Sequence, residues 1–249
     1  MRTFQFIFII LFSSFNSFSQ GQEYLFPVNP GQRNYLSGSM GELRTTHFHG
    51  GIDIKTGGAI GWPIYAAADG YVSRIKVSPF GYGNALYIYH PNLGTTTVYG
   101  HLDKYEARIA DYVRNEQYKR KSFDLDLSLT KEVFSVAKGD LIAYGGNTGG
   151  SGGPHLHFEI RDEAQRPMNP LHYNFSEVID NIPPIAQLIA VRALDAEARV
   201  EDQFQTEQYS LFKRGKDYYI SRPIPVWGKI GIMVMGYDQL DGASNKTGI

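Results

Sequence analysis

The chain has 249 residues, of which 42% are hydrophobic and 20% charged, a composition that indicates a globular protein with one good core and part of a second. A formal net charge of −1 gives no support for a nucleic-acid partner, which usually meets a basic domain or stripe. With 17 Tyr, 15 Phe, 27 Gly and no Cys, we predict a mainly β fold of antiparallel strands without disulfides, in which any metal site relies mainly on nitrogen and oxygen ligands.

Residues 1–19 have the pattern of a signal peptide. Arg2 is a short basic start, residues 4–12 are mostly apolar, and small residues at 17 and 19 precede Gln20, as at a cleavage site. The apolar run is short for a bilayer span, although an uncleaved anchor is the alternative. We therefore expect an exported protein, periplasmic or extracellular, with no stable membrane insertion after cleavage.

Residues 20–40 are interrupted by prolines and glycines, so we interpret them as a lead-in segment. Ile64–Ala68 and Tyr71–Val77 then flank the turn signal Asp69-Gly70, and the second run alternates apolar and polar residues. This pattern predicts a β-hairpin.

A second pair of strands is predicted over residues 84–90 and 95–101, around the loop Pro91–Gly94. His101 then falls at the end of a strand. The charge-rich segment 103–131 is expected to be a surface insertion that is partly helical over residues 105–120. The glycine-dominated stretch 145–154 can bring its backbone close to another segment.

Beyond Pro183-Pro184 the sequence changes to further strand-like runs, such as residues 187–191 and 229–235. The region 185–249 is shorter than the roughly 100 residues of a complete β-sandwich. We therefore expect a partial β-sandwich-like domain there.

Two histidines stand two residues apart in the strand-like run His155 to Ile160. Side chains at i and i+2 of a strand leave from the same face, so His155 and His157 should point into one space. A pair of surface histidines is the alternative for this motif taken alone.

His49 and Asp53 are separated by two glycines, which argue against a helix and favour a loop that enters a strand at residues 52–54. An imidazole and a carboxylate are good zinc ligands. Together with a further histidine they leave one tetrahedral position open, which is the layout of a catalytic rather than a structural zinc site.

Three motifs in this order resemble the lysostaphin-type (LytM-type) zinc metallopeptidases, which cut peptides in bacterial cell walls. They are His49-x-x-x-Asp53, Tyr99-Gly100-His101-Leu102 and Gly153-Pro154-His155-Leu156-His157-Phe158-Glu159. The resemblance covers roughly Gly41 to Leu171, with the segment 103–131 interrupting it. It implies an antiparallel β-sheet catalytic domain with a cleft over residues 41–180.

The resemblance also implies a role for each residue of the motifs. His49, Asp53 and His157 would bind Zn²⁺, while His101 and His155 would stand beside the metal as catalytic histidines. The strand parity of His155 and His157 is consistent with this division. A His-Glu-x-x-His helix is absent from the sequence, so a glutamate base of that kind is not indicated.

The function expected from this resemblance is an exported zinc metalloendopeptidase that hydrolyses peptide cross-links of bacterial peptidoglycan. One alternative is a catalytically silent peptidoglycan-binding or regulatory module of the same fold. Another is a structural or adhesive β-protein whose histidines are incidental.

Other histidines carry weaker expectations. We expect His47 to face solvent, with a contact to substrate or to a ligand as the alternative, and we expect His90 and His172 to lie in turns. Glu159 shares the parity of His155 and His157, so it either orients a ligand histidine or is a structural carboxylate.

Arg44 is expected to be a solvated surface arginine, although it could hold a substrate carboxylate or an oxyanion. The tyrosines Tyr71, Tyr82 and Tyr87 are expected to pack on strands rather than to form a substrate platform.

Overall fold

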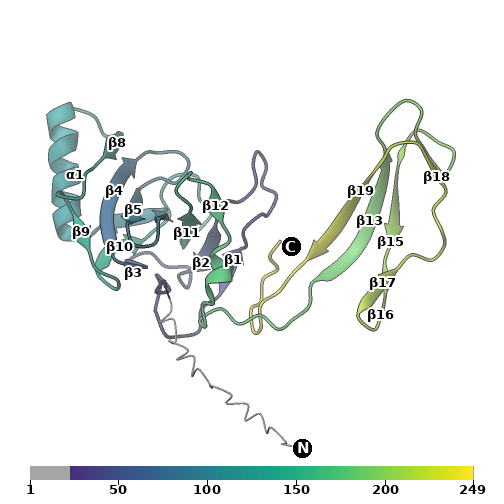
Figure 1. Ribbon diagram of the computed structural model, residues 1–249, viewed down its shortest axis with the longest axis horizontal. Coiled ribbons are helices and arrows are strands. Elements are labelled where there is room, and N and C mark those ends of the chain that lie inside the picture. Colours follow the sequence, from purple (N-terminus) through teal and green to yellow (C-terminus); the bar gives the residue numbers. More distant parts are fainter. Residues whose placement is uncertain (1–22, 249) are drawn as a thin grey trace, which may run out of the picture.

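The structure, a computed structural model, describes residues 23–248 (Figure 1). The predicted signal peptide at 1–19 lies outside the described residues. The fold is mainly β and its sheets are antiparallel, which confirms the predicted fold class. Within residues 23–248, no helix is long and apolar enough to cross a membrane.

A nine-stranded antiparallel sheet forms the centre of the larger domain. Its strands are β1 (Leu36–Gly38), β2 (Ile52–Lys55), β4 (Gly70–Val77), β5 (Ala85–His90), β6 (Thr95–Gly100), β8 (Leu125–Ser128), β9 (Ser135–Val136), β11 (His155–Arg161) and β12 (Pro167–Met168). They follow the order β1-β2-β11-β6-β5-β4-β8, with β12 beside β11 and β9 beside β4. The first and third motifs therefore lie on neighbouring strands although about 100 residues separate them in sequence.

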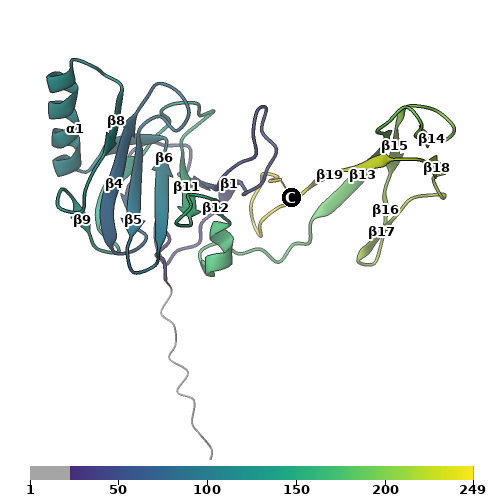
Figure 2. The same cartoon turned by 45° about the horizontal axis from the view of Figure 1, so that its top comes forward.

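A smaller sheet packs with this one and contains β3 (Pro63–Tyr65), β10 (Leu141–Gly145) and β7 (Leu102–Tyr105) in the order β3-β10-β7. The helix α1 (Ala107–Arg120) follows β7 and confirms the helical character expected there. It lies at the outer end of the domain beside β8 (Figure 2), where Ile109 and Val113 pack into the core. A short 3₁₀ helix, η1 (Pro170–Tyr173), follows β12.

The two faces of strand β11 differ: one packs into the core, and the other belongs to the polar face of the sheet. Leu156, Phe158 and Ile160 are fully buried in the main apolar cluster. Because alternate residues of a strand face opposite sides, His155 and His157 lie together on the other face. The predicted shared face of the two histidines is confirmed.

The hairpin predicted around Asp69-Gly70 is wrong. Strand β3 pairs with β10 in the small sheet, whereas β4 pairs with β5 and β8 in the large one. The connecting alanines, residues 66–68, are buried, and their backbone bonds go elsewhere: Ala67 N–H donates to the Tyr99 hydroxyl at 2.8 Å. The packing of the two sheets, rather than the local turn sequence Asp69-Gly70, therefore decides how β3 and β4 pair.

The last part of the described chain forms a separate group of strands, which extends away from the main sheet (Figures 1 and 2). It consists of β13 (Ile185–Ala193), β14 (Arg199–Val200), β15 (Thr206–Ser210), β16 (Phe212–Arg214), β17 (Asp217–Tyr219), β18 (Val226–Trp227) and β19 (Ile230–Tyr237). The longest strands form one sheet in the order β15-β13-β19. The strands expected here are present, and their sandwich-like character stays a prediction.

His90 corrects another expectation. The predicted strand pair is present as β5 and β6, with His90 opposite Thr95. The expectation of a turn histidine is wrong, because the His90 side chain is fully buried. Its Nδ1–H donates to the Asp69 carbonyl at 2.9 Å, and its Nε2 lies 2.8 Å from the Thr97 hydroxyl. Burial lowers the pKa of His90 below its usual value.

This buried histidine makes stability depend on pH. The unfolded state binds the proton of His90 more readily than the folded state does, so its contribution is complete above about pH 6.5 and is lost as the pH falls below that value. In the presence of a chelator, the free energy of unfolding of the wild type should decrease more between about pH 7.5 and about pH 5.5 than that of His90→Gln. The difference is at most about 1.4 kcal/mol per pH unit. Parallel pH profiles in denaturant titrations would contradict this assignment.

Candidate metal centre

The register of two neighbouring strands brings the first and third motifs together. On β2 and β11, Asp53 lies directly opposite His157, and both residues are on the polar face of the sheet. His49 is in the loop that enters β2, as expected for two glycines before a strand. The three side chains are buried.

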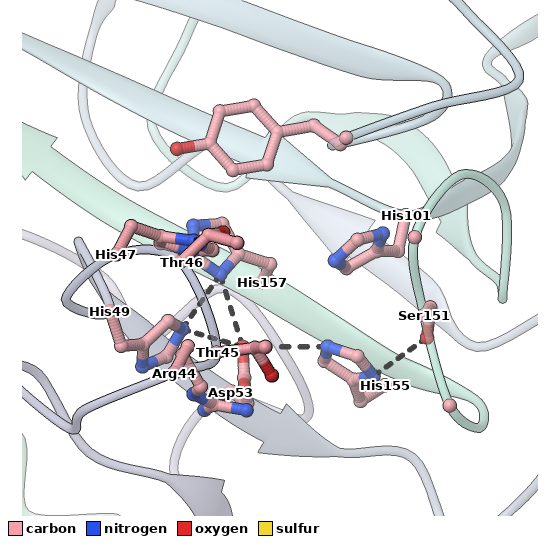
Figure 3. Close-up of a pocket in the computed structure, with 14 residues that line it drawn as sticks. Arg44, Thr45, Thr46, His47, His49, Asp53, His101, Ser151, His155 and His157 are labelled. Carbon is pink, nitrogen blue, oxygen red and sulfur yellow. Dashed lines mark hydrogen bonds and ion pairs between the residues drawn. The ribbon is translucent and has the colours of Figure 1, made fainter.

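The atoms of these three residues converge on one point (Figure 3). His49 Nε2 lies 3.0 Å from His157 Nδ1, and Asp53 Oδ1 lies 3.0 Å from each of these nitrogens. Among residues 23–248, this trio is the group of His, Asp and Glu side chains whose geometry suits a metal ion. Two imidazole nitrogens and one carboxylate oxygen are a donor set that zinc accepts while keeping a position open.

The outer nitrogen of each ligand histidine donates a hydrogen bond. His49 Nδ1 lies 2.7 Å from the Ser39 carbonyl, and His157 Nε2 lies 2.8 Å from the Glu159 carboxylate. These oxygens accept, so the ring nitrogens facing them carry the protons. The inner nitrogens then present lone pairs to one another and to Asp53. A cation at their centre removes this repulsion, and the residues therefore fit a divalent metal.

Protons compete with a metal for this site. Without a metal, a proton can occupy an inner nitrogen instead. Burial would raise the pKa of Asp53, but in that protonated form hydrogen bonds from His155, His157 and His49 hold it well below its usual range. Burial opposes a charged His157, whereas hydrogen bonds to Asp53 and Glu159 outweigh it and raise the pKa of His157. Metal binding displaces such a proton.

Behind His157 lies a buried polar network. Glu159 is fully buried and accepts a bond of 2.6 Å from Arg161 Nε as well as one from the Tyr82 hydroxyl. Burial opposes the ionised form, but the bonds from His157 and Arg161 lower the pKa of Glu159 to about 2. Of the two interpretations left open for Glu159, the structure supports the one in which it orients a histidine of the candidate metal site.

His101 and His155 form a second pair, 4.8 Å apart between ring centroids. Each Nδ1–H donates to a backbone carbonyl at 2.8 Å, that of Thr148 for His101 and that of Gly153 for His155. Their Nε2 lone pairs are therefore free for chemistry, and His155 Nε2 lies 3.4 Å from Asp53 Oδ1. Burial lowers the pKa of His101 to about 4, so its ring is neutral at neutral pH.

The position of His101 depends on the glycine-rich loop 145–154, which approaches the main sheet as expected. His101 has a positive φ of 58° between β6 and β7. Thr148 fixes the loop, since its hydroxyl accepts from Asn84 N–H and donates to the Leu102 carbonyl, both at 2.9 Å. This arrangement directs the Thr148 carbonyl at the His101 ring.

All five predicted site residues line one cleft of about 390 Å³. Figure 3 shows the ligand trio and the pair of His101 and His155 around the same space. Arg44 is only partly solvated, with 38% of its side chain exposed, and its guanidinium lines the cleft and pairs with Asp53 Oδ2 and Glu42 Oε2, both at 2.9 Å. This pairing leaves Asp53 Oδ1 to face His49 and His157.

Three further expectations are settled here. His47 is exposed, as expected, and also lines the cleft. His172 is exposed but lies in the 3₁₀ helix η1 rather than in the turn expected for it. Strand packing is confirmed for Tyr71 and Tyr87, on β4 and β5. Tyr82 also packs on strand residues, against Ala85, Tyr87 and Val98, and in addition it lines the cleft and stacks on His157 with ring centroids 4.8 Å apart.

The groups that orient the histidines were not predicted from the sequence. Ser39 and Thr148 act through backbone carbonyls, which leave no signal in residue type. Arg161 could have been predicted as the partner of Glu159, because the two residues lie on the same face of a strand and a buried glutamate requires a partner.

Replacing Glu159 should weaken metal binding without removing a ligand. In Glu159→Gln the amide cannot supply the negative charge that fixes the His157 tautomer, so the affinity for a divalent metal should fall about 10- to 100-fold. Glu163→Gln is the matched control, because Glu163 is exposed in the following turn. Equal dissociation constants for the two variants in a chelator competition would exclude this role of Glu159.

A family model for peptidase family M23 matches residues 47–118 and 123–170. Among curated relatives, the DD-carboxypeptidase/endopeptidase Mpg of Neisseria meningitidis is 34% identical over 129 residues, which are 52% of this chain and 23% of that protein. The peptidoglycan DD-endopeptidase ShyA of Vibrio cholerae is 32% identical over 146 residues, 58% of this chain and 27% of that protein. This chain thus spans about a quarter of the length of these curated relatives.

Solved structures with a similar domain include a zinc containing peptidase from Vibrio cholerae, 29% identical, covering 58% of this chain and 37% of that chain with a TM-score of 0.42. The catalytic domain of lysostaphin from Staphylococcus simulans is 21% identical and covers 56% of this chain and 91% of that chain, with a TM-score of 0.41. The family match includes all three motifs and confirms the resemblance seen in the sequence. Residues 47–118 and 123–170, which carry the candidate metal centre, therefore have the sequence pattern of peptidase family M23.

Proposed function

We propose that this protein is an exported zinc-dependent endopeptidase that hydrolyses peptide cross-links of bacterial peptidoglycan. The observation that carries the proposal is one cleft with three convergent ligand atoms and, beside them, two imidazoles with free lone pairs. The names of the relatives support the substrate class and make DD cross-links the first bonds to test. Export is supported by the signal-peptide pattern at residues 1–19.

We assign the metal as zinc, held by His49, Asp53 and His157. Carboxylate-only sites suit magnesium or calcium, whereas two imidazoles favour a transition metal or zinc. Three protein ligands leave a position for water or substrate, which is the arrangement of catalytic zinc sites. The bonds to Ser39, Glu159 and Arg44 orient all three ligands before any metal binds.

Zinc, when bound, polarises a scissile carbonyl and lowers the pKa of a nearby water to about 7. In this mechanism His101 and His155 move the protons. Because Thr148 and Gly153 accept from the Nδ1–H groups, each Nε2 can accept the proton of the attacking water. The same nitrogen then returns it to the amine that leaves. The hydrogen bond to Thr148 keeps the His101 ring oriented for both steps.

His101 should be required for turnover and dispensable for metal binding. In His101→Ala, the protein should keep one zinc per chain, while hydrolysis slows by about 10²- to 10⁴-fold, the usual contribution of a positioned acid or base. His172→Ala, a change at an exposed histidine of η1, should leave both quantities unchanged. Metal content and initial rates measure the two effects, and undiminished turnover in His101→Ala would remove this residue from the mechanism.

The wild type, loaded with zinc, should release cleaved fragments from peptidoglycan. Mass spectrometry of the muropeptides after digestion names the bond, and loss of cross-linked dimers with gain of monomers is expected. His157→Ala should release none, since it loses a metal ligand. If the wild type binds zinc stoichiometrically but cleaves no peptidoglycan preparation, the protein is a silent peptidoglycan-binding or regulatory module instead.

A further inference from the structure

Residues 238–248, here called the clasp, return from the end of β19 to the main-sheet domain. Asp238 and Thr247 close the base of this segment with two backbone hydrogen bonds of 2.9 Å. Between them, Leu240 and Ala243 are buried in the main apolar cluster together with core strands. The clasp is therefore anchored in the core of the domain that carries the cleft.

The clasp contacts both β1 and β2. Asn245 Nδ2 donates to the Leu36 carbonyl at 3.0 Å, and the Asn245 amide oxygen accepts from Lys55 Nζ. Asp53 lies on β2 two residues before Lys55. The side chain of Asn245 thus joins the two strands at the edge of the sheet on which the metal ligand Asp53 lies.

The end of the clasp holds the loop that follows β1. The Ser39 hydroxyl donates to the Gly248 carbonyl at 2.9 Å, and Gly248 N–H donates to Glu42 Oε1 at 2.5 Å. Glu42 Oε1 also accepts from Ser39 N–H at 3.0 Å. These bonds form a closed network of three residues across about 200 positions of sequence.

The same residues orient two metal ligands. The Ser39 carbonyl accepts the hydrogen bond from His49 Nδ1 at 2.7 Å, and the other oxygen of Glu42 pairs with Arg44, which in turn pairs with Asp53. Ser39 alone connects the clasp to His49, and Glu42 and Arg44 together connect it to Asp53. The clasp therefore acts on the ligands through Ser39 and Glu42.

The loop between β1 and β2 has little packing of its own. Leu43 and Phe48 are 79% and 71% exposed, so the loop buries little apolar surface and gains little stability from it. Without the clasp, more loop conformations would compete with the one that directs the Ser39 carbonyl at His49. Part of the free energy of metal binding would then offset the entropy cost of ordering the loop, and the affinity for the metal would be lower.

We propose that the clasp is a positioning element of the metal centre, with Asn245, Ser39 and Glu42 as its positioning residues. The proposal rests on the proposed zinc site and extends it to a segment outside the residues matched by the family model. Because β19 leads directly into residue 238, the clasp also joins the β15-β13-β19 sheet to the metal-ligand loop.

The test is zinc affinity and loop protection in Asn245→Ala, measured on the full chain. Competition with a chromophoric chelator should give a dissociation constant for zinc about 3- to 10-fold higher than that of the wild type, at the lower end of effects seen for groups behind metal ligands. Hydrogen exchange of the metal-free protein, followed by mass spectrometry, should show faster exchange in residues 39–49. Asn92→Ala is the control, because Asn92 is exposed in the loop between β5 and β6.

Ser39→Ala provides a second measurement that leaves the clasp sequence intact. It removes the hydroxyl bond to Gly248 but keeps the Ser39 carbonyl, and it should also raise the zinc dissociation constant. Unchanged zinc affinity and unchanged exchange in both variants, with a wild type that binds zinc, would overturn the proposal. A wild type that binds no zinc would instead overturn the proposed function, and faster exchange of residues 39–49 would still be expected in Asn245→Ala.

Discussion

The outward donation of N–H groups by four histidines is the interaction on which the rest of the site depends. His49, His101 and His155 each donate Nδ1–H to a backbone carbonyl, and His157 donates Nε2–H to Glu159. An imidazole bound in this way has one tautomer and presents a lone pair on its other nitrogen. Four lone pairs thus face one cleft, together with the Asp53 carboxylate.

This arrangement divides the histidines into two pairs with different surroundings. The inner nitrogens of His49 and His157 are 3.0 Å apart and share Asp53, so they suit a cation. Backbone carbonyls hold His101 and His155 at Nδ1, and His155 Nε2 lies 3.4 Å from Asp53 Oδ1. Burial keeps the pKa of His101 low, so the two rings suit proton transfer. The difference lies in what surrounds the inner nitrogen of each ring rather than in the residue type.

The sheet supplies the distances that the side chains need. Asp53 lies opposite His157 because β2 and β11 pair in that register. The approach is close at Gly51, where an added Cβ would lie 2.2 Å from the Phe158 carbonyl oxygen. A side chain at this position would push β11 away from the loop that carries His49. The geometry of the candidate metal centre therefore depends on sheet packing as much as on its three side chains.

The sequence was sufficient to predict the positions of the motif residues, but it said little about the groups that orient them. Strand parity correctly placed His155 and His157 on one face, and two glycines correctly put His49 in a loop before β2. The pairing of β3 with β10 and the burial of His90 could not be read locally, because contacts with distant segments decide them. The carbonyls of Ser39 and Thr148 were invisible for another reason, since every residue has such a group.

The most direct test of a site built from these lone pairs is anomalous diffraction at the zinc absorption edge on crystals of the full chain grown with zinc. We expect one strong peak in the cleft, bonded to His49 Nε2, Asp53 Oδ1 and His157 Nδ1, with His101 and His155 unbound at Nε2. A peak ligated by His155 in place of His157, or no peak at the trio in crystals that hold zinc elsewhere, would contradict the division of roles between the two histidines of β11.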